Sequence, residues 1–427
     1  MCLVLMLILA AEEPTTMIVP PFRHTLGFNR IGRFYISMYL GPDFKLAEPE
    51  GLCGVKMEEE DDPSTGRDDH ILTLFGVNSG TGQIVYNVRL LEPRIYGRMG
   101  SDTGQFLNPH GICCTNQGDV YVADTDNDRI VRLRYSNGRL SWVTSFGNSL
   151  RRPHDVAVDS RGLVYVADTE NDRIRVFRPS GTLVADWSPL LEKPTGIGVL
   201  DQAARFNDFG HECAVVIDRG GTRLNQFNLS GQLLRQTDCR RIGLDTAGFA
   251  YCAFDRHGNL YVTDRLNSQV HLFDAGLRYI ISYAGPADAR LNSPRGIAIG
   301  RQFGQVFLSE ADGGSYYWLG LDGYLIGCYP QSFNSQRPGT TIALYITEMA
   351  EVTVEVSDSL GRVVRSLTPP HQQRPGEVLI VWDGNDNQGG LVPEGEYRIK
   401  VTVRPVYSQP KYILKKELFG RVWRTAG

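Results

Sequence analysis

The sequence has no excess of basic residues and no long apolar run. Lys and Arg total 44 against 48 Asp and Glu, which gives a formal net charge of −4. Proteins that bind nucleic acid or anionic membranes through charge usually carry a basic surface, so this balance argues against both partners. A transmembrane helix needs about 20 consecutive apolar residues, and no stretch reaches that length. We therefore expect a chain without a membrane span.

Cysteine is present but never in a metal-binding spacing. None of the eight cysteines forms a C-x-x-C pair, which argues against a thiolate zinc site. Cys53, Cys113 and Cys252 fall in expected strands, where a buried free thiol is the usual role. One disulfide stays possible if the chain is exported, but no disulfide framework is indicated.

The common catalytic motifs are absent as well. The sequence contains no Gly-rich phosphate loop, no G-x-S-x-G and no H-E-x-x-H. Ser, His and Asp are plentiful, but no spacing singles out a nucleophile. The sequence therefore leaves enzyme status undecided, favours a binding protein, and predicts no cofactor.

What the sequence does contain is a repeat. VYVADTDNDRIVRL begins at Val120 and VYVADTENDRIRVF begins at Val164. Three later segments are related, and an eroded earlier copy starts at Ile71, which makes six units. The acids that mark five of them are Asp124, Asp168, Asp218, Asp264 and Glu310, at intervals of 44, 50, 46 and 46 residues. A period of this size predicts units that bury their apolar faces against their neighbours.

Each unit reads as four short strands. A Pro-x-Gly or Pro-x-Asp opens a strand, a Gly turn leads to a strand such as VYVAD, and a polar turn and two further strands follow. This is the pattern of a propeller blade. The chain is therefore predicted to be all-β, with a six-bladed β-propeller over residues 16–335. We expect strands in residues 17–47, a segment that contains RFYISMYL, to complete a blade and close the ring.

The repeated residues resemble the NHL-repeat β-propellers, through the Pro-x-Gly opening, the VYVAD strand and the Asn-Asp-Arg-Ile turn. In such a ring the repeated acids are structural residues at strand ends that bind nearby backbone N–H groups. Arg129 and Arg173 are expected to pair with acids. A calcium loop at Asp124–Asp128 is disfavoured, because the sixth position is Arg129 rather than Gly.

After residue 339 the period stops. Residues 340–404 show short alternating strands and Gly-rich turns, which predict a small Ig-like β-sandwich. Trp382-Asp383-Gly384 and Gly395-Glu396-Tyr397 resemble the Ig-like domain of the flagellar hook-capping protein family, with Trp382 and Tyr397 as core residues. Residues 405–427 form a basic, amphipathic tail.

A propeller offers a binding site at the mouth of its channel, where equivalent positions of all blades meet. The residue after the opening Pro is such a position. Around the ring it reads Glu50, His110, His154, Thr195, Ala250 and Arg295. We predict a protein or small ligand bound there.

An alternative is a metal site made by Glu50, His110 and His154. The pairs Pro109-His110 and Pro153-His154 resemble the zinc histidines of peptidyl-hydroxyglycine amidating lyases, which implies a zinc- or calcium-dependent lyase or hydrolase. The third histidine of that family has no counterpart in the propeller, since Pro370-His371 lies outside it.

The N-terminal sequence MCLVLMLILAA resembles the core of a secretory signal, although it lacks a basic start. We therefore expect residues 1–11 to be a signal segment, and the protein to be extracellular or periplasmic, at the cell envelope. The preferred hypothesis is an exported binding or scaffold protein, with an oligomeric state that the sequence leaves open.

Overall fold

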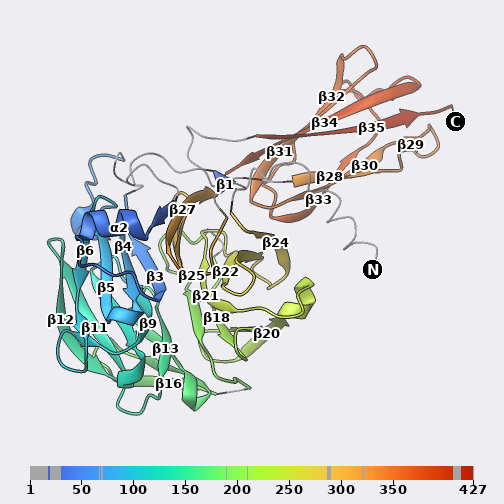
Figure 1. The fold of residues 1–427 in the computed structure, drawn as a ribbon. Coiled ribbons are helices and arrows are strands. Elements are labelled where there is room, and N and C mark those ends of the chain that lie inside the picture. The colour runs from blue at the N-terminus through green and yellow to red at the C-terminus, as the bar shows by residue number, and fades with distance from the viewer. Residues whose placement is uncertain are drawn as a thin grey trace. The chain divides into compact units, whose positions relative to one another are not determined.

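The computed structural model describes residues 18–19, 30–66, 68, 71–188, 190–208, 210–285, 290–319, 321, 323–406 and 415–426. The predicted signal segment 1–11 lies outside these residues. The chain divides into two compact units, residues 20–318 and residues 1–19 with 319–427. Strands dominate both units (Figure 1), so the predicted all-β class is confirmed.

Residues 20–318 form a propeller of six antiparallel sheets. The first strands of successive blades contact one another around a closed ring, from β3 through β9, β13, β17, β21 and β25 back to β3. Blade one contains β3 (Pro49–Val55), β4 (Thr73–Asn78), β5 (Gln83–Val88) and β6 (Glu92–Tyr96). Blade two contains β9 (Pro109–Cys114), β10 (Asp119–Asp124), β11 (Arg129–Ser136) and β12 (Arg139–Phe146). Blade three contains β13 (Pro153–Val158), β14 (Val164–Asp168), β15 (Arg173–Phe177) and β16 (Leu183–Trp187).

The remaining blades repeat this order. Blade four contains β17 (Gly196–Leu200), β18 (Cys213–Asp218), β19 (Arg223–Phe227) and β20 (Leu233–Asp238). Blade five contains β21 (Phe249–Phe254), β22 (Leu260–Asp264), β23 (Gln269–Phe273) and β24 (Tyr279–Tyr283). Blade six contains β25 (Pro294–Gly300), β26 (Gln305–Glu310) and β27 (Gly313–Leu319). The short strands β7 (Arg98–Met99) and β8 (Gln105–Phe106) form a parallel pair between blades one and two.

The N-terminal segment closes the ring. The short strand β1 (Ile18–Val19) comes first in the chain, and the next strand, β2 (Arg30–Gly32), pairs with β27, with Arg30 opposite Ser315. This confirms that residues before blade one complete blade six. RFYISMYL itself is the helix α2 (Arg33–Leu40) and not a strand. Among the described residues, no helix is long and apolar enough to cross a membrane.

The repeated turn has a backbone requirement that explains its sequence. The 3₁₀ turns η3 (Thr125–Asn127) and η4 (Thr169–Asn171) end at Asp128 and Asp172, which have left-handed φ angles of 53° and 51°. Asp and Asn tolerate this conformation better than other residues with a side chain. The Asn-Asp-Arg turn is therefore a conformational signal for the chain to reverse into the third strand.

The cores lie between neighbouring blades. Phe75 and Tyr86 of blade one pack against Tyr135 of blade two, with ring centroids 5.5 and 6.4 Å from it. Tyr165 and Trp187 of blade three form one cluster with Phe227 of blade four. No blade buries its faces by itself, so each depends on its neighbours.

The other unit contains a β-sandwich. One sheet has the order β28-β30-β33 and the other β29-β35-β34-β31-β32. Trp382 is fully buried, and its ring lies 5.3 Å from Phe333 and 5.6 Å from Tyr397. Both predicted core residues are thus confirmed. The strands are β28 (Gly323–Tyr329), β29 (Ser332–Phe333), β30 (Thr340–Ile346), β31 (Ala350–Ser357), β32 (Val363–Leu367), β33 (Gly376–Trp382), β34 (Gly395–Pro405) and β35 (Lys416–Arg424).

The boundaries of the sandwich differ from the sequence prediction. Residues 323–329, assigned to the propeller, form β28, which pairs with β30 of the sandwich. Within the expected tail 405–427, residues 416–424 form β35, which pairs with β34. The reason is that β2 already supplies the fourth strand of blade six, so the alternating strand after β27 is free to join the next domain.

Candidate functional site

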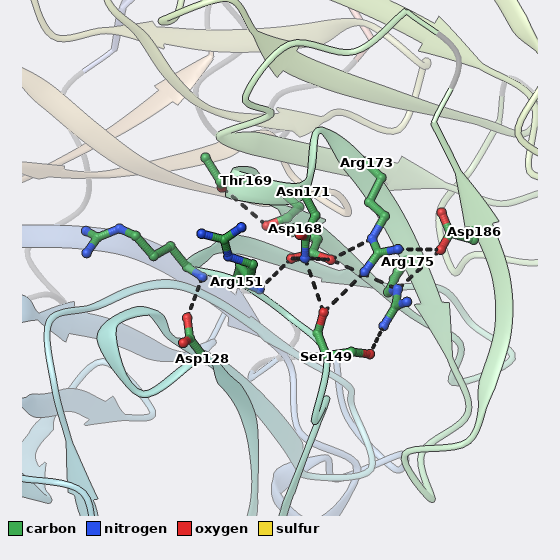
Figure 2. Close-up of polar contacts among 11 residues, drawn as sticks. Asp128, Ser149, Arg151, Asp168, Thr169, Asn171, Arg173, Arg175 and Asp186 are labelled. Atoms are coloured by element: carbon green, nitrogen blue, oxygen red, sulfur yellow. Dashed lines mark hydrogen bonds and ion pairs between the residues drawn. The ribbon is translucent and has the colours of Figure 1, made fainter.

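In blade three, the buried carboxylate of Asp168 collects donors from a linker, a turn and a strand (Figure 2). The backbone N–H of Arg151 donates to its Oδ1 over 2.7 Å, and Asn171 Nδ2 and Arg173 Nε donate to its Oδ2 over 2.9 and 2.7 Å. A buried carboxylate is stable only with such partners. Asp168 therefore ties the incoming linker to its own blade.

An equivalent hydrogen bond between linker and blade occurs in all six blades. The residue that ends the second strand accepts a backbone N–H from the linker that precedes the blade. The donor and acceptor pairs are Ala47–Asn78, Leu107–Asp124, Arg151–Asp168, Glu192–Asp218, Gly248–Asp264 and Asn292–Glu310. Arg129 and Arg173 pair with Asp124 and Asp168 of their own blades, at 2.8 and 2.7 Å. These residues build the ring and leave no carboxylate free for a ligand.

The predicted site residues lie at one end of the channel, near the starts of the first strands. We call this end the first mouth. His110 and His154 pack with ring centroids 4.3 Å apart. Glu50 forms an ion pair with Arg295. Thr195 precedes β17 and donates its backbone N–H to Ile217 over 2.8 Å, and Ala250 is buried.

His110 is held at the first mouth by hydrogen bonds to its own blade, whereas His154 Nδ1 is buried without a hydrogen-bond partner among the described residues. His110 Nδ1 lies 2.9 Å from both the Asn108 carbonyl and Thr125 Oγ1. Burial lowers the pKa of His110, although the charge of Glu50 opposes the shift. Burial and the neighbouring His110 lower the pKa of His154 much further. Both rings are therefore neutral near pH 7.

Glu50, one of the proposed metal ligands, already has partners at the first mouth. The guanidinium of Arg295 and the hydroxyl of Tyr251, at 3.1 Å, both bind the Glu50 carboxylate. Across the described ranges, no three side chains of His, Cys, Asp or Glu are placed to hold a metal ion. A cation already paired with Glu50 disfavours a second cation there.

Two channel residues were missed in the sequence. In four blades, the residue that follows the predicted ligand position is Gly. The first strands of neighbouring blades approach closely there, and a Cβ on Gly111 would lie 2.1 Å from Asp155 Oδ1. The other two blades place Asp155 and Tyr251 at this position. The signal in the sequence was a residue other than Gly at a position that is Gly in the other four blades.

Behind the first mouth, the channel encloses a cavity of about 160 Å³. Its lining includes Asp155 and the thiols of Cys53, Cys113, Cys114 and Cys252. Burial raises the pKa of Asp155 to about 8, although hydrogen bonds from the backbone N–H groups of Ile197 and Val156 act to lower it. Burial also raises the pKa of Cys53, Cys113 and Cys252 well above the usual thiol value. Asp155, Cys53, Cys113 and Cys252 are thus neutral groups of this lining near pH 7, and every cysteine in the described part of the chain is a free thiol.

A larger pocket lies where the first strands end, at the second mouth. Its volume is about 620 Å³, and it shares Gly54, Cys114, Val158, Val199, Ile299 and Arg301 with the channel cavity. Its charged lining residues are Lys56, Asp119, Asp159, Arg161, Asp201, Arg205 and Arg301. No predicted site residue belongs to this lining, so this spacious polar pocket lies away from the expected patch.

The carboxylates of the second mouth are bound by nearby chain. Asp201 accepts from the backbone N–H of Ser160 over 2.9 Å and from that of Ala203 over 3.0 Å. Asp159 accepts from Arg161 and Tyr165. Arg205, by contrast, is exposed and stacks on the Phe206 ring at 4.9 Å, and no carboxylate of the described residues pairs with it. The guanidinium of Arg205 therefore presents an unpaired positive charge to a ligand at this pocket.

A long loop supplies Arg205. Residues 201–212 connect β17 to β18, and Arg256 of blade five fixes this loop by binding Asp208 over 2.8 Å. The insertion was visible in the sequence as the 50-residue interval between Asp168 and Asp218, against 44 to 46 elsewhere. Loops on a rigid scaffold are the usual carriers of binding residues.

Comparisons with known families agree with this architecture. NHL repeats are matched at residues 106–133 and 150–177, and an FlgD Ig-like domain is matched at residues 332–405. No curated protein matches the sequence.

Several solved structures are similar at low identity. A gluconolactonase from Xanthomonas campestris shares 13% identity over 72% of this chain and 99% of its own, with a TM-score of 0.47. A streptogramin B lyase shares 14% identity over 65% and 95%, with a TM-score of 0.45. PorZ, a surface component of the type-IX secretion system of Porphyromonas gingivalis, shares 12% over 91% and 53%, with a TM-score of 0.43. Likeness at this level assigns no activity. The chain thus combines NHL repeats in a β-propeller with a C-terminal FlgD Ig-like domain.

Proposed function

We propose that this chain is an exported or envelope-associated binding protein whose propeller recognises a small anionic ligand at the second mouth. The observation that carries the proposal is the pocket of about 620 Å³ with an exposed Arg205 on its inserted loop. Asp159 and Asp201 already accept hydrogen bonds from their own surroundings, whereas no carboxylate of the described residues pairs with Arg205. Such a pocket favours a carboxylate, phosphate or sulfate group.

The scaffold suits recognition rather than movement. The six carboxylate and amide anchors hold each linker to its blade, so the loops around the mouth stand on a rigid ring. We propose that the FlgD Ig-like domain attaches the propeller to a partner or to the cell envelope. The domain match and the finding that no described helix could cross a membrane are compatible with an envelope or extracellular location.

The competing function is a metal-dependent lyase at the first mouth. The contact between His110 and His154 is compatible with it, but the pairing of Arg295 with Glu50 opposes it. We therefore place the ligand at the second mouth.

Isothermal titration with citrate, glucose 6-phosphate and chondroitin disulfate disaccharide would test the proposal. We expect at least one anion to bind, and Arg205→Gln to weaken that binding about tenfold, which is a typical loss for one charged hydrogen bond. Arg240→Gln is the matched control, because Arg240 is equally exposed but outside the pocket. Equal loss in both variants, or no binding of any anion, would contradict the proposal. Zinc binding that is lost in His110→Ala would instead support the lyase.

A further inference from the structure

A polar chain crosses the outer strands of several blades at equivalent positions. In blade three it runs from Asp168 to Arg175, seven residues later, and on to Asp186 on β16 (Figure 2). In blade four, Asn225 Nδ2 donates to Asp218 over 2.8 Å, and Gln236 Nε2 donates to Asn225 over 2.7 Å. The repeat therefore places three polar side chains in line on strands two, three and four.

Blade five fills these positions with Asp264, His271 and Ser282. His271 Nε2 lies 3.1 Å from Asp264 Oδ2, and His271 Nδ1 lies 2.6 Å from Ser282 Oγ. The side chains of His271 and Asp264 are both 0% exposed, and Phe249 packs edge-on against the imidazole with centroids 5.5 Å apart. The imidazole is thus fixed between a carboxylate and a hydroxyl.

The hydrogen bonds define the roles of the two ring nitrogens. Burial raises the pKa of Asp264, but the bonds from His271, Asn267 and backbone N–H groups outweigh it and hold the pKa at about 2. An ionised carboxylate only accepts, so Nε2 carries the proton and donates it to Asp264. In the neutral imidazole, Nδ1 then presents its lone pair, and the Ser282 hydroxyl donates to it. This is the relation of base to nucleophile in hydrolytic triads, with the two ring nitrogens exchanged.

We propose that Ser282 is an activated nucleophile that reacts with small ester or phosphoryl electrophiles, with His271 as its base and Asp264 as a positioning residue. Ser282 Oγ attacks the carbonyl carbon while its proton passes to His271 Nδ1. The bond to the leaving alcohol then breaks, and the alcohol takes that proton. The site is reachable, because Ser282 is half-buried on the outermost strand and its other neighbour, Tyr279, is 37% exposed, with its hydroxyl 2.8 Å from Ser282 Oγ.

The chain contains a matched serine without a base. Ser145 of blade two occupies the position of Ser282 on the fourth strand, opposite Val131, as Ser282 lies opposite His271. Ser145 is also the more exposed of the two. Exposure therefore favours reaction at Ser145, whereas activation favours Ser282.

Labelling with diisopropyl fluorophosphate, followed by peptide mass spectrometry of the full chain, tests the proposal. The O–P bond forms, fluoride leaves, and the proton passes through His271 to water. General-base assistance is typically worth about 100-fold or more, so we expect Ser282 to react about 100-fold faster than Ser145. His271→Asn, which copies the Asn225 arrangement, is expected to remove this difference, and Ser282→Ala to remove the label.

The comparison of the two serines within the unaltered chain decides the question even if His271→Asn fails to fold. Equal rates at Ser282 and Ser145, absence of label at Ser282, or unchanged labelling in a folded His271→Asn chain would each overturn the proposal. This site is independent of the second mouth, so failure of either proposal leaves the other intact.

Discussion

At the scale of single residues, repetition reveals architecture better than it reveals function. Asp124 and Asp168 could be placed at strand ends because the sequence repeats them, and they lie there. Tyr251 and Asp155 could not be found this way, since they depart from the repeat at the glycine position. Arg205 was also missed in the sequence, because it lies in an insertion that has no counterpart in the other blades. A search for repeated residues finds what every blade needs, whereas Asp155, Tyr251 and Arg205 each occur in one blade alone.

Asp155 gives a prediction about pH. Its folded pKa of about 8 exceeds the ordinary value of 3.8, so between these values the folded protein keeps a proton that the unfolded chain has lost. The free energy of unfolding should therefore fall as pH rises from 4 to 8, by at most about 1.4 kcal/mol per unit from this group. Urea denaturation at pH 5 and pH 8 would measure it.

Asp155→Asn supplies the comparison, because the amide does not titrate. We expect the variant to lose less stability than the unaltered protein between pH 5 and pH 8, whatever its absolute stability. Parallel losses in the two proteins would show that Asp155 is ionised in the folded state.

At the scale of elements, the presence of strands could be predicted, but the sheet to which each strand belongs could not. GYLIGCY, which forms β28, alternates as the fourth strand of a blade would. It belongs to the sandwich instead, because β2 already occupies the fourth-strand position of blade six. The period of a strand reports burial of one face and says nothing of which sheet covers it. RFYISMYL was ambiguous for a related reason, since a short apolar run suits a strand or a helix equally.

Ring closure by β2 can be tested with two proline substitutions three residues apart. Ile31→Pro removes a backbone N–H in the strand that pairs with β27. Phe34→Pro lies in the first turn of α2, where Pro is tolerated, and Phe34 is 75% exposed. We expect Ile31→Pro to lower the free energy of unfolding by about 2 kcal/mol or more, and Phe34→Pro to have little effect in the same urea titration. Similar losses would argue against closure by β2.

At the scale of the whole molecule, the two units follow different rules. In the described part of the propeller, the buried clusters join neighbouring blades, whereas one cluster around Trp382 fills the sandwich. The sequence indicated both folds, through the repeat period and through the Trp382 and Tyr397 motifs. The location of the protein rests on the N-terminal segment, which lies outside the described residues.

Export is therefore a prediction for the whole chain. A version tagged at the C-terminus and expressed in a Gram-negative host should appear in the periplasm or envelope, with its N-terminal residues removed. Cell fractionation and mass spectrometry of the intact protein would show this. Replacing Leu5 and Leu7 with Glu should keep the chain in the cytoplasm, because a signal core must be apolar. Export unaffected by this change would exclude residues 1–11 as the signal.

The pairing of β2 with β27 has a consequence for the timing of synthesis. Arg30 meets Ser315 only after almost the whole propeller has left the ribosome, so the ring stays open until its last blade is made. Contacts so distant in sequence form late and slowly. Because β2 precedes blade one and β27 belongs to the last blade, the ring of a chain predicted to be exported is still open while most of the propeller is being made.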